Sequence, residues 1–290
     1  MTPSRLVLLF LLVTTLAGCS ANRLLYNRAD TFIRWAADDY VALDREQQAA
    51  FDQRLDEFLA WHRSQELPRY RAFIVTSLDT LEDGVTLEEA VAISEEIDLA
   101  ADRFQLQFVE LLLATAEDLS DDQLQEFLAE LEQNQTDYAE ERLVRDEDAY
   151  YQDSAKTMND LVKRLMGRLN AEQKDEIQAR SKQLMRIDGL WHEDRARWGS
   201  ALRVILEEKA PGWQAEIRIL GETRSKARIP EYVAGIEHNG DVILSLLVDT
   251  INSRTERQDR RMRRFLQGLI GDIDALTAAS AAEGLVVEQG

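Results

Sequence analysis

Apolar residues recur every three or four positions along almost the whole chain, the spacing that gathers them on one face of an α-helix. The clearest stripe runs beside a strongly acidic face and consists of Ile93, Ile97, Ala101, Phe104, Phe108 and Leu111. No segment alternates strictly between apolar and polar residues, as a half-buried strand would. With 13 glycines and 4 prolines in 290 residues, turns are too few for an all-β or low-complexity chain. The pattern predicts an all-α fold, an elongated multi-helix bundle.

Three expected helix starts share one form, a leucine, an N-cap residue and a glutamine three positions after the cap. They are Leu43-Asp44-x-x-Gln47, Leu119-Ser120-x-x-Gln123 and Leu169-Asn170-x-x-Gln173. In such a capping box the cap side chain accepts from the N3 amide, while the glutamine accepts from the amide of the cap residue. Helices are therefore predicted to begin directly after each cap.

Turn-forming residues mark the expected helix breaks. These lie near Asp83-Gly84, Ala210-Pro211-Gly212, Ile229-Pro230 and His238-Asn239-Gly240. Pro68 falls inside a helical pattern, so it should kink or end that helix. Between the breaks we expect one long helix over residues 170–209. The apolar run Val242–Val248 should form a helix in the middle of the bundle.

The N-terminus has the order of a secretory signal, in which Arg5 precedes the apolar run Leu6–Val13 and small residues follow. That run is shorter than the roughly 20 residues that a spanning helix needs. Its end, Leu16-Ala17-Gly18-Cys19, resembles the lipobox of bacterial lipoproteins. The resemblance implies cleavage before Cys19, a thioether-linked diacylglycerol on its sulfur, and acylation of the new amine by a chain such as palmitate.

This assignment divides the chain into a signal peptide (1–18), a lipidated N-terminus and tether (19–22) and a helical domain (23–290). Cys19 is the only cysteine, so its lipidation leaves no thiol for a disulfide or a thiolate metal site. Ser20 stands where an aspartate would indicate retention in the inner membrane. By resemblance to that sorting rule, we expect a lipid anchor in the outer membrane and a body facing the periplasm.

Charge is distributed unevenly along the chain. The formal net charge is −20, and residues 79–153 contain 24 acidic side chains against 3 arginines. Such an acidic chain is not expected to bind nucleic acid, which needs a cationic face. A cationic stretch near the end consists of Arg254, Arg257, Arg260, Arg261, Arg263 and Arg264. It could contact anionic lipid or a partner, or it could pair with Glu256, Asp259 and the acidic segment.

His62 and Glu66 stand four residues apart on a predicted helix, where a carboxylate could orient an imidazole for proton transfer. The alternative is an ordinary polar contact between helical neighbours. His192 beside Glu193 raises the same question, and His238 is expected in a loop. No histidine pair has zinc-ligand spacing, and no phosphate-binding loop is present. We therefore expect no metal, no cofactor and no enzyme activity.

Adjacent acidic residues within the acidic segment are a further candidate. The pairs are Glu88-Glu89, Glu95-Glu96, Glu117-Asp118 and Asp121-Asp122. Paired carboxylates could act in glycoside hydrolysis or bind calcium, but helical periodicity favours a solvated face. A weak, diffuse affinity for divalent cations is compatible with such a solvated acidic surface.

Three sequence blocks resemble a family of uncharacterised proteobacterial helical lipoproteins. They are Leu25-Tyr26-Asn27-Arg28-Ala29-Asp30, Asp38-Asp39-Tyr40-Val41-x-Leu43 and Trp61-His62-Arg63-x-x-Glu66-Leu67-Pro68-x-Tyr70. That resemblance implies a lipidated signal and a helical body, and it implies no activity. The leucine–cap–glutamine segments are more loosely similar to the LTxxQ motif of periplasmic stress chaperones, although none of the three has threonine at the cap.

These observations favour a non-catalytic binding or scaffold role for an outer-membrane-anchored periplasmic lipoprotein, with an envelope protein as its partner. One alternative is chaperone-like binding of unfolded envelope proteins. A second alternative is a cell-wall or glycan hydrolase that uses His62 and Glu66 or the acidic pairs.

Overall fold

The computed structural model describes the backbone of residues 18–287 and the side chains of residues 22–278. Every regular element in this part of the chain is helical, which confirms the all-α prediction. Leu16 and Ala17 of the lipobox lie outside the described residues, whereas Gly18 and Cys19 begin helix α2 (Gly18–Tyr26). Within residues 18–287, no helix combines the length and the apolar character needed to cross a membrane.

The first part of the chain continues through α3 (Ala29–Asp38), α4 (Arg45–Trp61), the π-helical turn η1 (His62–Glu66), α5 (Leu67–Thr80), α6 (Leu87–Glu117) and α7 (Asp121–Tyr138). A second π-helical turn, η2 (Ala139–Leu143), ends α7. The second part consists of α8 (Glu147–Met166), α9 (Ala171–Ser181), α10 (Asp188–Glu208), α11 (Trp213–Glu222), α12 (Pro230–Asn252) and α13 (Glu256–Val287).

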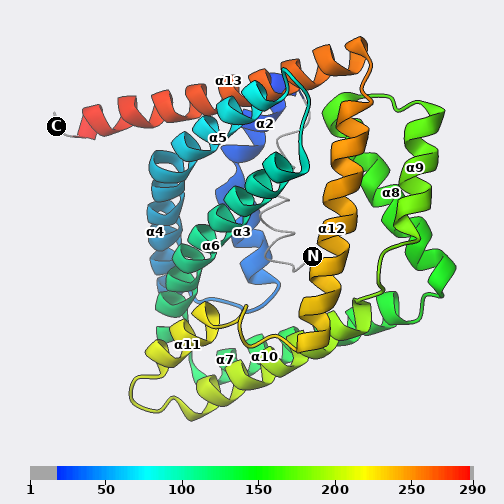
Figure 1. Cartoon of the computed structure of the whole chain (residues 1–290). Helices are drawn as coiled ribbons and strands as arrows, with labels where there is room; N and C mark the ends of the chain where they lie inside the picture. The colour runs from blue at the N-terminus through cyan, green and yellow to red at the C-terminus, as the bar shows by residue number, and fades with distance from the viewer. Residues whose placement is uncertain (1–17, 288–290) are drawn as a thin grey trace.

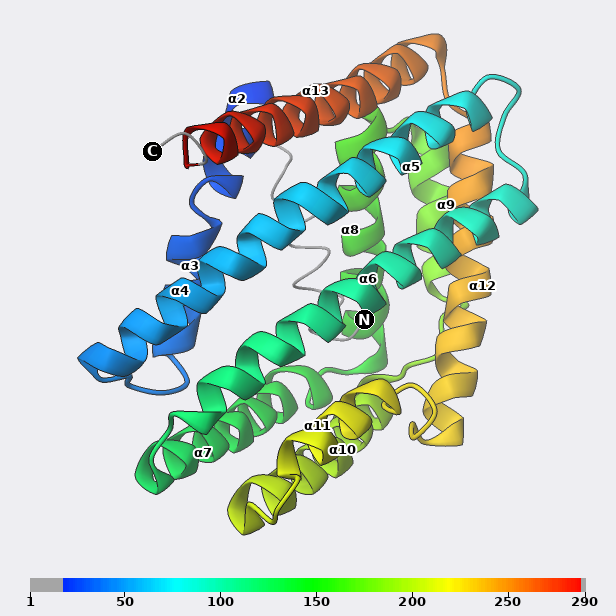
Figure 2. The same ribbon diagram turned by 90° about the vertical axis from the view of Figure 1, so that its left-hand side faces the viewer.

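The helices are arranged as the sides of an open frame (Figure 1). One side is α4 with α5, the next is α13, the third is α12 with α8 and α9, and the fourth is α7 with α10 and α11. Helix α6 packs against α4, α11 and α12, and the turned view in Figure 2 shows α4 and α5 running on as one helix beside it. The outline is therefore broader than that of the elongated bundle suggested by the sequence.

Buried apolar side chains form four separate clusters instead of one central core. One joins α8, α9, α12 and α13, and a second joins α6, α7, α10 and α11. A third lies between α3, α4 and α6, and a fourth lies between α5 and α13. Deeply buried members, in the same order, are Val162, Leu128, Leu55 and Ile74. Neighbouring sides of the frame are thus each sealed by their own apolar contacts.

The three predicted capping boxes are confirmed at α4, α7 and α9. At α4, for example, Asp44 Oδ1 accepts from Gln47 N at 2.9 Å, and Gln47 Oε1 accepts from Asp44 N at 2.9 Å. Two further boxes begin α6, from Thr86 and Glu89, and α13, from Thr255 and Gln258. The sequence search missed both because neither cap follows a leucine.

The box glutamines also join helix starts in pairs. Gln47 Nε2 donates to Gln123 Oε1 at 2.8 Å, and Gln123 Nε2 donates to Gln47 Oε1 at 2.7 Å. The other amide hydrogens go to the carbonyls of Asp118 and Ala42, each at 2.7 Å. Each amide thereby uses both donors and both lone pairs, so it caps its own helix and ties α4 to α7.

A second glutamine pair ties α9 to α13 in the same way. Gln258 Nε2 donates to Gln173 Oε1 at 2.8 Å, and Gln173 Nε2 lies 3.4 Å from Gln258 Oε1. Gln258 Nε2 also donates to the Arg168 carbonyl at 3.1 Å. Both glutamines of this pair are buried, which distinguishes it from the first.

The expected long helix over residues 170–209 is wrong, because residues 182–187 separate α9 from α10. Asn239 of α12 holds this break: its Oδ1 accepts from Met185 N at 2.7 Å, and its Nδ2 donates to the Met185 carbonyl at 2.9 Å. The expected break at His238-Asn239-Gly240 is also wrong, because α12 runs through it. The other three breaks are confirmed.

The apolar run Val242–Val248 lies within α12 but is less enclosed than predicted. Among its residues Leu246 is buried, while its neighbours are partly exposed. Helix α12 packs on α9, on α6 and on α10, and its residues Ile243, Leu244, Leu247 and Val248 pack at the edge of the first apolar cluster.

Candidate functional site

His62 and Glu66 are the first and last residues of the π-helical turn that joins α4 to α5. The Leu67 N–H bonds to the His62 carbonyl five residues back, which widens the turn. Pro68 follows at the start of α5. Because proline has no N–H to donate, a widened turn before it loses no hydrogen bond, and the helix continues instead of ending at Pro68.

Glu66 is completely buried, at 0 % exposure, and its charge is matched by two arginines. Arg103 of α6 donates two hydrogen bonds to the carboxylate, from Nε to Oε1 at 2.9 Å and from Nη2 to Oε2 at 3.0 Å. Arg69 donates a further bond from Nη1 at 2.9 Å. The hydrogen bond that Arg103 donates to Glu66 raises the pKa of Arg103, since it favours the charged guanidinium. The site is a buried ion pair in fork geometry that links α6 to the α4–α5 helix.

His62 is buried in a ring of aromatic side chains. Its Nδ1 lies 2.9 Å from the Tyr26 hydroxyl, with which it shares a hydrogen bond, and its ring meets Tyr70 and Phe104 edge to face. Burial lowers the pKa of His62 to about 4, so the imidazole is neutral at pH 7. Burial and the nearby Glu66 charge raise the pKa of Tyr70, whose hydroxyl stays protonated.

The described contacts do not join His62 and Glu66 to each other. The Tyr26 hydroxyl shares a hydrogen bond with Nδ1 of His62. The Glu66 carboxylate accepts hydrogen bonds from Arg103 and Arg69. The arrangement acts as a structural clamp that binds α2, the α4–α5 helix and α6 together.

The other histidines lie apart from this clamp. His192 stacks on Tyr138 with ring centroids 6.2 Å apart and an interplanar angle of 11°. His238 belongs to helix α12 and not to the expected loop, and its Nε2 lies 2.9 Å from the Gln183 carbonyl. Both positions serve packing between helices.

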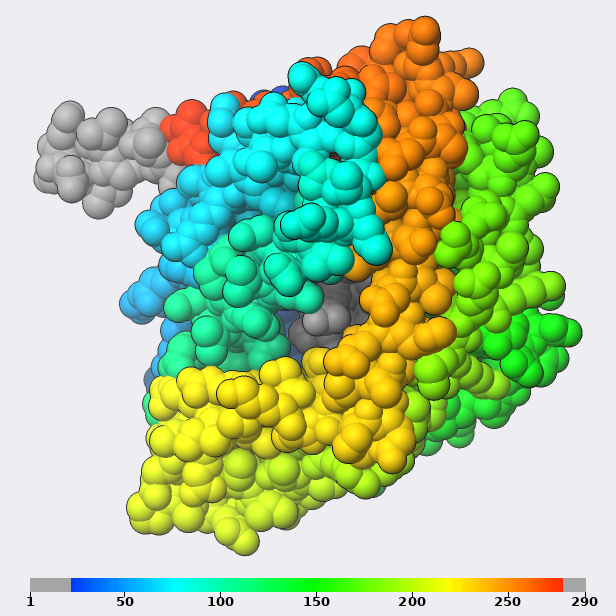
Figure 3. Space-filling view, viewed as in Figure 1, coloured from blue at the N-terminus to red at the C-terminus, as the bar shows by residue number. Residues whose placement is uncertain are grey.

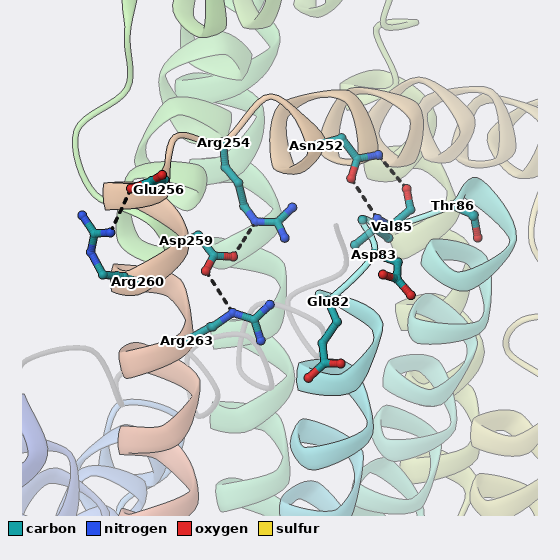
Figure 4. A pocket seen from close by; sticks show the side chains of 11 residues that line it. Glu82, Asp83, Val85, Thr86, Asn252, Arg254, Glu256, Asp259, Arg260 and Arg263 are labelled. Carbon is teal, nitrogen blue, oxygen red and sulfur yellow. Dashed lines mark hydrogen bonds and ion pairs between the residues drawn. The ribbon is translucent and has the colours of Figure 1, made fainter.

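The arginine stretch borders a groove of about 760 Å³ at the corner where α12 meets α13 (Figure 4). Arg254 Nε and Arg263 Nε each donate to Asp259, at 2.8 and 2.9 Å, and both side chains also reach the Leu81 carbonyl. Across the groove, Asn252 forms two hydrogen bonds with the backbone of Val85, at 2.7 and 2.8 Å. These two arginines therefore fasten α13 to the turn after α5.

The remaining arginines of the stretch are exposed: Arg257, Arg260, Arg261 and Arg264. Arg260 pairs with Glu256 on its own helix at 3.3 Å, and Arg264 Nε donates to the Arg260 carbonyl. The ion pairs described for the arginine stretch are formed with Glu256 and Asp259. Within the acidic segment, the Leu81 carbonyl accepts a hydrogen bond from Arg254. Its outer face stays available to an anionic surface.

The acidic pairs serve several different local roles. Glu89 closes the capping box of α6, while Asp121 and Asp122 lie in the first turn of α7, where the helix dipole favours negative charge. Asp118 forms an ion pair with Arg54 at 2.7 Å, and Glu117 accepts from Gln214 at 2.8 Å. Among the described residues, no group of three or more acidic, histidine or cysteine side chains is placed to hold a metal ion.

Sequence analysis missed one cluster of charged residues. Arg195 of α10 comes close to Arg224 and Arg228, which lie in the connection from α11 to α12. Their positions are too far apart in sequence for a local motif, and only the pairing of α10 with α11 and α12 brings them together.

Comparison with known proteins assigns the chain to a family. A family described as a family of unknown function (DUF6279) matches residues 39–233. No curated protein and no solved structure matches the chain. The matched range includes the π turn, Glu66, Arg103 and the Arg195–Arg228 cluster.

Proposed function

Since the chain belongs to the DUF6279 family of unknown function, we propose a function from its own surfaces. It is a non-catalytic binding protein of the bacterial envelope, held by lipid on Cys19 at the outer membrane and facing the periplasm. The lipobox-like end of the N-terminal segment supports the location. One observation supports the binding role, an exposed aromatic pair on a firmly docked helix near that anchor.

The aromatic pair is Phe32 and Trp35 on α3, which are 49 % and 66 % exposed. The opposite face of α3 packs against α4 through Ile33 and Ala37. Arg34 fixes this contact by donating to Asp52 of α4 at 2.7 Å. The helix therefore holds two large apolar side chains toward solvent without needing to rearrange.

Exposed tryptophan and phenylalanine side chains are typical anchors of protein interfaces, because each buries a large apolar area with few rotatable bonds. Two exposed acidic residues, Asp38 and Asp39, follow this pair at the end of α3. The partner that suits such a surface is an envelope protein with an apolar pocket and a basic rim.

The test is affinity capture from a crosslinked envelope extract with the tagged full chain in detergent. We expect one stoichiometric partner with wild-type protein and loss of that partner with Phe32→Ala/Trp35→Ala. The matched control, Val144→Ala/Val204→Ala, removes exposed apolar side chains elsewhere and should retain it. Equal capture by all three proteins would exclude α3 as the binding surface.

A second candidate is chaperone-like shielding of unfolded envelope proteins. It is favoured by exposed apolar side chains along the acidic helix α6, namely Leu87, Val91, Ile97, Leu99, Leu106 and Leu112. Exposed apolar side chains that are scattered over an acidic surface suit binding to many different clients better than binding to one partner. The full chain should then suppress aggregation of a diluted, urea-unfolded outer-membrane protein, and unchanged light scattering would exclude this role.

A further inference from the structure

Three arginines come together beside two tryptophans where α10 meets the connection between α11 and α12. Arg195 lies over the ring of Trp191 with its guanidinium carbon 5.3 Å from the centroid, and Arg224 lies over Trp198 at 4.8 Å. Trp191, Arg195 and Trp198 share one face of α10, since they are spaced four and three residues apart. Arg228 reaches the same region from the end of the connection.

Several donors of this cluster are buried without an acceptor. Among the described residues, none accepts a hydrogen bond from the indole N–H of Trp191 or Trp198, or from Nε of Arg224 or Arg228. Buried polar groups are normally paired, and a group left unpaired costs stability. Four such donors in one region are the arrangement expected of a site whose acceptor comes from outside the chain.

The charge of the cluster is also unbalanced. Burial, and then repulsion from Arg195 and Arg228, lower the pKa of Arg224 to about 10, and Asp194 is the carboxylate that opposes them. Asp194 is buried and accepts from Ile229 N at 3.1 Å, so it also serves the backbone. Three guanidinium groups and one carboxylate leave a local charge of about +2.

We propose that Arg195, Arg224 and Arg228, which lie beside Trp191 and Trp198, bind a phosphate-class dianion. Guanidinium groups match phosphate oxygens with paired donors, and a double negative charge neutralises the site. A carboxylate carries half of that charge and fewer acceptor positions. The cluster is a ligand site separate from the α3 surface.

The connection that carries Arg224 and Arg228 joins two helices that border a hollow in the surface. The face seen in Figure 3 is hollowed between α6, α11 and α12. A phosphate could arrive free in solution, or as part of a lipid headgroup beside the anchored membrane.

The experiment is titration of the full chain in detergent, with tryptophan fluorescence and calorimetry as readouts. Inorganic phosphate is one probe, and phosphatidic acid in mixed micelles is the other. Binding of inorganic phosphate identifies a free ligand, and binding of phosphatidic acid alone identifies a headgroup. Either result supports the site when Arg224→Gln and Arg228→Gln each weaken affinity by about tenfold or more, as loss of a charge-assisted bond predicts.

Arg218→Gln is the matched control, because Arg218 is exposed on α11 and paired with Glu110 at 2.6 Å. It should leave both titrations unchanged. Circular dichroism of each variant verifies that it is folded. Absence of binding to both probes, equal binding of acetate, or affinity unaffected by the Arg224 and Arg228 substitutions would overturn the proposal.

Discussion

The chain buries charged side chains in two regions, which differ in how far these charges are paired. At the clamp, Glu66 is enclosed by Arg103 and Arg69, and the described hydrogen bonds satisfy both of its oxygens. At the α10 cluster, Arg195, Arg224 and Arg228 face one carboxylate that also caps a backbone amide. The Glu66 carboxylate is matched by donors within the chain, whereas the described part of the chain leaves Nε of Arg224 and of Arg228 without an acceptor.

This difference separates a structural role from a binding role. Burial of a charge is costly, and pairing offsets that cost only when the geometry is good. The clamp meets this condition by itself and holds three elements together. The arginine cluster meets it only with an added anion, so the two regions should respond in opposite directions when one charge is removed.

The largest effect is expected at the clamp. Arg103→Ala removes the paired donors from Glu66 and leaves a buried carboxylate, which should lower the free energy of unfolding by about 3–5 kcal/mol. Urea denaturation of the full chain measures it. Arg69→Ala is the matched comparison, and because Arg69 is more than half exposed its loss should cost at most about 1 kcal/mol. Equal effects would show that Arg103 does not carry the pair.

Acid should weaken the clamp next. The pKa of His62 is lowered to about 4 in the folded chain, against 6.5 when unfolded, so the unfolded chain binds the extra proton first. Stability should be unaffected above pH 6.5 and fall from there to pH 4, by at most about 1.4 kcal/mol per pH unit. His62→Gln should flatten this slope relative to wild type. An identical slope in His62→Gln would refute the assignment.

The two glutamine pairs form the same motif at different depths, since Gln173 and Gln258 are buried and Gln47 and Gln123 are part-buried. Gln258→Ala leaves the buried Gln173 without its partner and removes the donor to the Arg168 carbonyl, so a loss of about 2–3 kcal/mol is expected. Gln123→Ala breaks the same motif where water can replace it, and about 1 kcal/mol should be lost. Thermal unfolding of both variants measures the difference, and equal losses would show that burial of the pair adds nothing.

The smallest effect is expected at the arginine cluster in the absence of anion. Arg224→Gln removes one buried, repelled charge and should change stability by less than about 1 kcal/mol, toward greater stability. Adding phosphate should stabilise wild type but not this variant, as ligand binding to the folded state requires. A large loss in anion-free buffer would assign Arg224 a structural role.

Local features of this fold could be read from the sequence. Helical class, most breaks and three capping boxes depend on residues within a few positions of each other, and these predictions are confirmed. Thr255 and Gln258 form a capping box without a preceding leucine, so the leucine–cap–glutamine pattern does not predict it. The pairing of the box glutamines was invisible, because it joins helices about 80 residues apart.

Features that depend on distant partners could not be predicted. The 182–187 break is held by Asn239, a residue that local spacing had assigned to a break of its own. The four-residue spacing suggested that His62 and Glu66 act as a pair. In the structure His62 is bonded to Tyr26, and Glu66 is bonded to Arg103. The arginine cluster has no sequence signal because its members come from separate elements.

The π turn at His62–Glu66 changes the phase of the helix that contains it. An α-helix turns by about 100° per residue, and a π turn holds about one residue more, so everything after it is rotated relative to a regular helix. Before the turn, Phe51, Leu55 and Phe58 face α6; after it, Leu67 and Ile74 face α13. One continuous helix can thereby serve two neighbours that lie in different directions, and the open frame of Figure 1 gains its corner without a break in the chain.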